Sequence, residues 1–361
     1  MTPERRGESS EKGDAARMER PEGNVTIAKI AELAGTSKMT VSRVINKKGN
    51  VAEKTRRRIE KVMREMDYSP NVFAQGLATK KTGILGLVAG GKDFGSAEGF
   101  QNIIFGVENE AIQGGYDVLF MAGAKGQNLL DHIRPSLVEG VVLFGSRMDP
   151  RLAEYFAQRG IPLVVIGRRN WGDYHPPYYS PDYFTGYQQV TRYLLSLGHR
   201  RIAVVGGYLD FEADLDKYQG YWSALEEACI ARDPGLEVQE NHMEEISALL
   251  EGRSATALII SGAAAWKWVM EEIVRKKYRI PEDFSLVLSG LGMEYEAMNL
   301  RPLLRVEEIT RLEFPDYEMG VQAVRYLLRQ LSGEGAMEEA PDHLVPMQFV
   351  QGDSCGRLSS V

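Results

Sequence analysis

The sequence has little cysteine, no long apolar stretch and no apolar segment at its start. Its 361 residues include two cysteines, Cys229 and Cys355, which argues against a framework of disulfide bonds and indicates a reducing compartment. No stretch approaches the ~20 apolar residues that are needed to cross a bilayer. Residues 1–23 are rich in charge, Gly and Ser, so they are predicted to be a disordered tail and not a secretory signal. The predicted location is therefore the cytoplasm, with no membrane partner.

The residue patterns on which enzymes depend are also missing. The five histidines are scattered along the chain without the spacing of metal ligands. They are His132, His175, His199, His242 and His343. No Ser/His/Asp or Cys/His signature and no phosphate-binding GxxxxGK occurs. The sequence thus predicts no enzyme, no cofactor and no bound metal.

Charge is present, but it is distributed unevenly along the chain. The net charge is −7, yet residues 24–83 contain 13 Lys and Arg against 5 Asp and Glu. Residues 84–361 contain 25 basic against 39 acidic residues. A small basic unit therefore precedes a large acidic one, which would repel phosphate and keep DNA at the basic end. On charge alone, a solvated basic face with no partner is the alternative.

The basic unit has the pattern of a helix-turn-helix. Three short helices are predicted, over residues 27–34, 38–45 and 53–66. Thr26 and Ser37 can cap the first two helices, because each hydroxyl can accept from a free first-turn amide. Gly35 ends the first helix, and the short turn that follows places the second helix across it.

In a helix-turn-helix, the start of the second helix lies at the base edges of the major groove. The guanidinium fork of Arg43 matches guanine O6 and N7, Lys38 can reach a base or a phosphate, and Met39 would pack on a thymine methyl. An ion pair of Arg43 with a nearby carboxylate is the alternative. The further residues predicted to contact DNA, mostly at phosphates, are Thr26, Ser37, Ser42, Asn46, Asn50 and Thr55.

Two segments resemble the lac repressor family of bacterial regulators. VTIAKIAELAGTSKMTVSRVIN, at 25–46, is similar to the N-terminal signature of the family, and YSPNVFAQGLATKKTGILGLV, at 68–88, is similar to its hinge. The resemblance extends in pattern over residues 25–356. It implies a hinge helix that forms on DNA and inserts Leu77 between base pairs of the minor groove, with Asn71 and Ala74 as further contacts. Gln75 and Gly76 depart from the family and indicate a weaker hinge helix, and packing of Leu77 on its own domain is the alternative.

From residue 84 onward, apolar runs alternate with helical patterns. The runs are ILGLVAG, DVLFMAG, GVVLFGS and PLVVIG, then RIAVVGG, ALIISG and SLVLSGL. The predicted helices lie near 97–113, 129–138, 151–159, 184–197, 217–228, 264–276 and 315–331. Such alternation predicts parallel, doubly wound α/β sheets in two lobes, with a ligand cleft beyond the strand ends. The resemblance implies the periplasmic-binding-protein fold, with three crossings between the lobes, and gives His199 a structural role and Asp182 the role of a helix cap.

The resemblance also implies an effector in the cleft, although this chain departs from the family there. Lys217 stands where sugar-binding members have an arginine. Gly352 stands where the C-terminal segment of family members has a second arginine. Gly292 and Met293 replace an acidic residue. Because few acids are left for sugar hydroxyls, the cleft suits a flatter, less polar or anionic effector. The predicted effector contacts are Phe94, Arg168, Lys217 and Trp266, with an ordinary amphipathic-helix position as the alternative for the tryptophan.

The sequence therefore predicts a homodimeric, sequence-specific DNA-binding regulator, a repressor on a near-palindromic operator, controlled by a carbohydrate-related small molecule. The predicted parts are a tail at 1–23, the helix-turn-helix domain at 24–69, the hinge at 70–83, and the effector-binding and dimerisation domain at 84–361. One alternative is the same regulator with a degenerate cleft that responds to a protein partner or to its own abundance. Another is a solute-binding protein.

Overall fold

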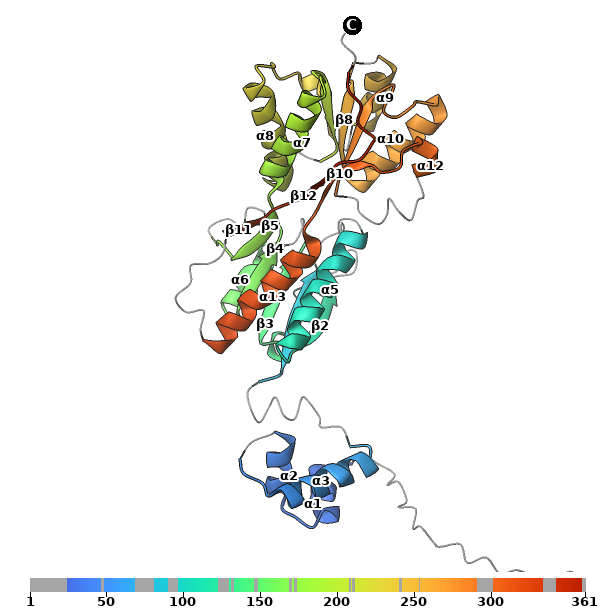
Figure 1. Ribbon diagram of the computed structural model, residues 1–361. Coiled ribbons are helices and arrows are strands. Elements are labelled where there is room, and N and C mark those ends of the chain that lie inside the picture. Colours follow the sequence, from blue (N-terminus) through green and yellow to red (C-terminus); the bar gives the residue numbers. More distant parts are fainter. Residues whose placement is uncertain are drawn as a thin grey trace, which may run out of the picture. The chain divides into compact units, whose positions relative to one another are not determined.

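A computed structural model divides the chain into two compact units, Met1–Lys81 and Thr82–Val361 (Figure 1). The structure describes residues 25–46, 49–68, 81–89, 97–122, 130, 133–145, 149–168, 171, 174–207, 209, 212–239, 242–252, 254–290, 301–333 and 342–358. Within these ranges, no helix combines the length and apolar character that crossing a membrane requires.

The first unit is a bundle of three short helices, α1 (Ile27–Leu33), α2 (Lys38–Ile45) and α3 (Glu53–Glu65). Both predicted helix caps are confirmed, because Thr26 Oγ1 accepts from the Lys29 amide at 3.3 Å and Ser37 Oγ accepts from the Thr40 amide at 3.1 Å. Gly35 has the predicted helix-ending conformation, with φ +56°. The core is small. It consists of Ile30, Ala31, Ala34, Val41, Ile59 and Val62.

The second unit has two lobes, each built on a six-stranded sheet. The first sheet has the order β11-β5-β4-β3-β1-β2, and all of its pairs are parallel. Its strands are β1 (Ile84–Ala89), β2 (Asp117–Ala122), β3 (Gly140–Phe144), β4 (Leu163–Ile166), β5 (Tyr178–Pro181) and β11 (Asp342–Val345). The central strands are buried almost continuously, as expected for a sheet that is covered on both faces.

The second sheet has the order β12-β10-β9-β8-β6-β7, with one antiparallel pair between β10 and β12. Its strands are β6 (Ile202–Val205), β7 (Glu237–Val238), β8 (Ala257–Ser261), β9 (Ser285–Ser289), β10 (Thr310–Glu313) and β12 (Gln348–Val350). The chain passes between the lobes after β5, after β10 and after β11. The predicted α/β class, the two lobes and the three crossings are all present.

Helices pack on both sheets. In the first lobe these are α5 (Ala97–Gln113), α6 (Arg151–Ala157) and α13 (Asp316–Ser332). In the second lobe they are α7 (Tyr183–Ser196), α8 (Glu212–Glu227), α9 (Met243–Glu251), α10 (Ala263–Lys276) and α12 (Arg301–Leu304). The pairs α5 with α13 and α7 with α8 lie side by side (Figure 1). Glycines allow this approach, since a Cβ on Gly106 would lie 2.2 Å from the Tyr317 carbonyl oxygen, and one on Gly220 would lie 2.2 Å from that of Phe184.

One predicted helix is wrong. In the described part of the segment predicted as a helix at 129–138, the structure has 3₁₀ conformation at Leu130 and at Pro135–Leu137, and no α-helix. Proline disfavours the helical conformation of the residue before it, and Arg134 is accordingly non-helical, with φ −113° and ψ 79°. The short strands β5, β7, β10, β11 and β12 were not predicted, because they lack the continuous apolar run that marks the buried central strands.

Candidate DNA interface and effector cleft

The solvent-facing side of α2 unites the residues predicted to read DNA. Lys38, Met39 and Arg43 are exposed, and Met39, an apolar side chain, is 64% exposed. At 100° per residue, these side chains and those of Ser42 and Asn46 fall within one arc of about 140°. Val41 lies on the opposite side, fully buried. The helix therefore presents one mixed apolar and polar face while its other face belongs to the core.

Asn46 and Ser42 are tied to each other on this face. The Asn46 side-chain amide donates to the Ser42 carbonyl oxygen at 2.9 Å and to Ser42 Oγ at 3.1 Å. Both residues are half-buried, so they shape the C-terminal end of α2. Thr26 and Ser37 serve as caps, while Asn50 is exposed and Thr55 is half-buried at the start of α3.

Arg43 has no carboxylate partner within the part of the chain that the structure describes. It lies beside the loop that follows α2, where an ideal Cβ on Gly49 would be 3.7 Å from Arg43 Cδ. Gly49 has φ +73°, a conformation that favours glycine. The ion pair that was the alternative for Arg43 is therefore not found in the described residues, and its guanidinium faces solvent.

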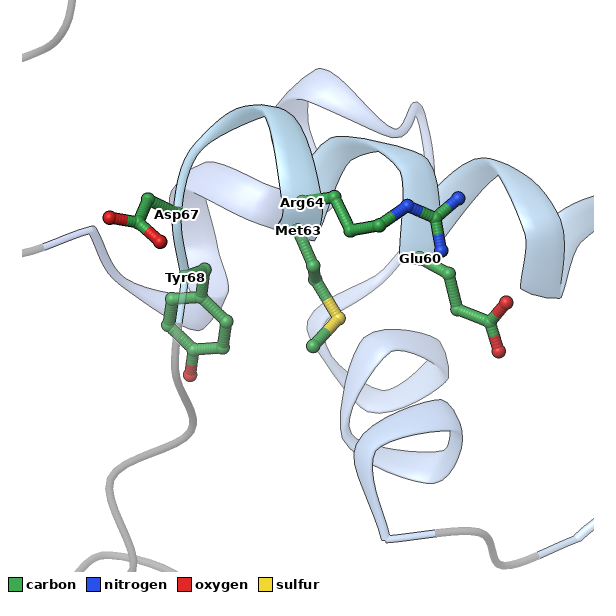
Figure 2. A pocket seen from close by; sticks show the side chains of 5 residues that line it. All are labelled: Glu60, Met63, Arg64, Asp67 and Tyr68. Atoms are coloured by element: carbon green, nitrogen blue, oxygen red, sulfur yellow. The ribbon is translucent and has the colours of Figure 1, made fainter.

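A surface hollow of about 420 Å³ lies at the end of α3, away from the predicted base-reading residues. It is lined by Glu60, Met63, Arg64, Asp67 and Tyr68. Figure 2 shows Met63 between Tyr68 and Glu60. The sequence did not predict this hollow, which forms where the chain turns back at Asp67 with φ +48°.

Residues 69–80 and 90–96 lie outside the described residues. The predicted hinge contacts Asn71, Ala74 and Leu77 and the predicted effector contact Phe94 are therefore not placed by the structure.

In the second unit, Arg168 forms an ion pair between the lobes. It follows β4 of the first lobe, and its Nη1 lies 2.6 Å from Asp216 Oδ2 on α8 of the second lobe. The Arg168 side chain is 40% exposed and that of Asp216 is 16% exposed. Burial raises the pKa of Asp216; Arg168 opposes that rise, and Asp182 and Glu212 add to it.

Lys217, the next residue on α8, is held within the second lobe. Its Nζ lies 2.7 Å from Asp214 Oδ1 and 3.1 Å from Ser261 Oγ, and the side chain is 11% exposed. The ammonium also lies 4.9 Å and 5.9 Å from the ring centres of Tyr183 and Phe314, within the range of a cation–π interaction. Burial alone would lower the pKa of Lys217, but Asp214 and neighbouring tyrosines outweigh it, so the pKa lies above its ordinary value.

Trp266 corrects the sequence-based expectation of an effector contact. Its side chain is 1% exposed and lies in the apolar core of the second lobe. The indole N–H is buried without a hydrogen-bond partner in the described structure. The residue lies on the face of α10 that packs against the core of the second lobe. The sequence pattern could not distinguish this face from one that lines a cleft. Trp266 is therefore a core residue.

Comparisons with known proteins identify the chain. The family described as "Bacterial regulatory proteins, lacI family" matches residues 26–71. The family "Periplasmic binding proteins and sugar binding domain of LacI family" matches residues 85–256, and "Periplasmic binding protein-like domain" matches 191–355. The probable HTH-type transcriptional repressor ExuR of Bacillus subtilis (strain 168) is 30% identical over 273 residues, which are 73% of this chain and 80% of that protein. The chain belongs to the lacI family.

Solved structures agree with this assignment. The complex of the transcriptional regulator CelR with cellobiose is 25% identical, has a TM-score of 0.63, and covers 92% of this chain and 100% of its own. The lac repressor dimer bound to operator and the anti-inducer ONPF has a TM-score of 0.74 at 22% identity, with the same coverage, and supports the fold. As a lacI-family member, the chain is a DNA-binding transcriptional regulator and not an enzyme. The match at 26–71 sets aside the alternative of a solute-binding protein.

The structure gives a physical reason for one departure from the lacI family. A Cβ on Gly352 would lie 2.3 Å from the Glu308 carbonyl oxygen. The arginine that the family resemblance implies at this position would therefore require the backbone to move. Next to it, Asp353 accepts hydrogen bonds from the Glu307 and Glu308 amides at 3.0 and 2.8 Å, which fixes the turn where the clash would occur.

His199 has the structural role that the family resemblance implied. It is 2% exposed and contacts Thr256 Oγ1 at 2.9 Å, Ser285 Oγ at 2.9 Å and the Gly356 carbonyl oxygen at 3.1 Å. The histidine thus joins the starts of two strands to the C-terminal segment. Asp182 is confirmed as the cap of α7, since its carboxylate accepts from the Thr185 amide at 3.0 Å.

Proposed function

We propose that this lacI-family protein is a repressor that binds a near-palindromic operator as a homodimer and responds to a small molecule in the cleft between its lobes. The observation that supports DNA reading most directly is the exposed face of α2, with Arg43 free of a carboxylate among the described residues. We propose that it acts in the cytoplasm. The proposed domain boundaries are those predicted from the sequence, with the DNA-binding domain at 24–69, the hinge at 70–83 and the effector-binding domain at 84–361.

DNA reading is tested with Arg43→Ala and a matched control, Arg57→Ala. Arg57 lies on α3, where its side chain is 76% exposed. An operator is first selected from random duplexes with the full chain, and affinities are then measured at fixed salt. Loss of a bidentate contact to guanine should weaken binding roughly 5- to 150-fold, whereas the control should stay within about twofold. Equal losses in both variants would contradict base reading by Arg43.

The hinge is part of this proposal. Leu77 would wedge between base pairs and bend the operator, with Asn71 and Ala74 beside it. Leu77→Ala should then weaken operator binding and reduce the bend, measured by the mobility of permuted DNA fragments. Unchanged affinity and unchanged bending would remove the wedge from the mechanism.

Dimerisation is proposed through α5 and the edge strand β2. Phe105 and Ile112 on α5 are 46% and 60% exposed, and Phe120 on β2 is 47% exposed. Exposed apolar side chains on adjoining elements are typical of an interface. The lac repressor dimer on its operator supports two-fold assembly on DNA. Sedimentation of Ile112→Asp should show a monomer, and a dimer of unchanged affinity would place the interface elsewhere.

The effector is proposed to be carbohydrate-related, as supported by the cellobiose complex of CelR. Arg168 and Lys217 remain the proposed contacts, together with Phe94. Neutral sugars, sugar phosphates and sugar acids are screened by thermal shift, since a ligand at a hundred times its Kd adds about 2.7 kcal/mol of stability.

The second candidate is the same regulator with a degenerate cleft. It is favoured by the ion pairs that already neutralise Arg168 and Lys217. This candidate would be supported if none of the screened sugars, sugar phosphates and sugar acids raised the unfolding temperature while operator binding stayed intact.

A further inference from the structure

We propose that the ion pair between Arg168 and Asp216 is a latch that holds the two lobes together without an effector. The inference rests on the proposed function only in that it assigns a mode of regulation to the same cleft. Two observations support the latch. Contacts of Lys217 hold α8 in place beside Asp216, and Asp216 would lose its arginine partner if the lobes separated.

The N-terminal part of α8 is anchored where the chain crosses between the lobes. Lys217 on α8 is nearly buried and lies over the rings of Tyr183 and Phe314. Tyr183 follows the first crossing, after β5, and Phe314 lies in the second crossing, after β10. The two rings are 5.4 Å apart, edge to face. One cation therefore joins both crossing segments to α8.

Phe314 is itself fixed in place. A Cβ on Gly290 would lie 2.4 Å from Phe314 Cζ, so the ring rests directly against backbone at the end of β9. Asp214 and Ser261 complete the surroundings of Lys217, with contacts of 2.7 and 3.1 Å. Because these contacts hold Lys217 against the crossing segments, the neighbouring Asp216 faces the first lobe.

Arg168 meets Asp216 from the opposite lobe at 2.6 Å. Asp216 is largely buried, and the charges of Asp182 and Glu212 are close enough to affect its ionisation. If the lobes separated, Asp216 would lose its arginine and remain in an acidic neighbourhood. The pair therefore favours the arrangement in which the lobes are in contact, and an effector that takes the Nη1 donor of Arg168 must first displace Asp216.

The latch also determines how effectors of different charge would act. A neutral molecule that leaves the pair intact adds to the contact between the lobes. An anion that binds Arg168 through Nη1 must replace Asp216 there, and so it exchanges one contact for another. The carboxylate on α8 thereby reduces the advantage of an anionic effector at this donor, which is the reverse of what Lys217 and Arg168 alone would indicate.

The test measures the distance between spin labels in the full chain without DNA. Cysteines replace Glu154 on α6 and Lys267 on α10, which are exposed residues of the two lobes, and Cys229→Ser removes the exposed native thiol. Dilution with unlabelled protein limits the measurement to distances within one chain. Arg168→Gln and Asp216→Asn should each increase the population with separated lobes about two- to fivefold, as for a partly exposed ion pair.

Charge reversal separates the latch from a general loss of charge. Arg168→Glu or Asp216→Arg alone should separate the lobes further, and the double reversal should restore the short distance. Arg192→Gln is the matched control, since Arg192 pairs with Glu227 at 2.7 Å within the second lobe, and it should leave the distance unchanged. The same distances in all variants, or a double reversal that does not restore the short distance, would overturn the latch.

Operator affinity is measured separately on the same variants. A wild-type chain that selects no operator would refute the proposed function without affecting the distances. A wild-type chain that binds its operator while its lobes ignore the Arg168 and Asp216 substitutions would refute the latch alone.

Discussion

Replacing Trp266 distinguishes a core residue from an effector contact. The side chain is 1% exposed among the apolar residues of α9, α10 and the second sheet. Truncating a buried tryptophan to alanine costs about 3–5 kcal/mol, since the cavity closes only in part. At the 2–4 °C per kcal/mol of a domain of this size, the unfolding temperature of Trp266→Ala should fall by about 10 °C.

Trp266→Phe should be much milder, and the structure gives the reason. The indole N–H is buried without a partner in the described part of the chain, and leaving such a group unsatisfied costs about 1–3 kcal/mol. Phenylalanine loses some packing but also removes this N–H, so the two effects oppose each other. We expect Trp266→Phe to lose less than half of the stability that Trp266→Ala loses.

The assay is thermal unfolding of the full chain, followed by circular dichroism. Trp268→Ala is the control, because Trp268 is on the same helix but is only partly buried against the core, and it should lose less. Unchanged stability of Trp266→Ala, combined with loss of effector binding, would refute the reasoning and return Trp266 to the cleft.

Three further substitutions follow from the same structure. Burial lowers the pKa of His199, and the hydrogen bond to the Gly356 carbonyl oxygen partly opposes this. The folded protein then binds a proton at His199 less readily than the unfolded chain does, so stability falls as the pH drops below the ordinary pKa of 6.5. Acidification below about pH 6.5 should destabilise the wild type more than His199→Gln, and parallel pH profiles in urea would contradict this. Gly352→Arg should destabilise the second lobe, because its Cβ meets the Glu308 carbonyl oxygen at 2.3 Å, and an unchanged melting temperature would show that the turn can shift. Ser37→Ala should lower the stability of the first unit by about 1 kcal/mol, because the hydrogen bond that caps α2 is lost. The loss is measured by the helical circular dichroism signal on heating. A loss no larger than that of an exposed surface substitution would mean that the capping hydrogen bond adds no stability.

The sequence predicted α1 and α2 well because their signals are local. Caps at Thr26 and Ser37 and a glycine at 35 determine where these helices begin and end, and each acts within four residues. The apolar strands of both sheets were equally visible, since burial on both faces leaves continuous runs such as ALIIS. The helix predicted at 129–138 was wrong because Pro135 disfavours the helical conformation at Arg134 and so interrupts the apolar pattern.

The cleft could not be predicted in the same way. The partner of Arg168 is 48 residues away on another lobe, and no local pattern shows that Asp216 will reach it. Lys217 was predicted to depart from the family, whereas its pairing with Asp214 and its contact with two crossing segments depend on tertiary packing. Trp266 and a cleft-facing tryptophan have the same helical spacing, so only the structure separates them.

The pairing of α5 with α13 has a consequence for synthesis on the ribosome. The three helices that bear the DNA-reading face are complete by residue 65, whereas α13 begins at Asp316 and β11, the last strand of the first lobe, ends at Val345. Until those residues emerge, the surface of α5 around Gly106 has no helix to cover it, although the second lobe has almost been made. A chain cut short before α13 would therefore retain the part that reads DNA while neither lobe that should control it could be completed.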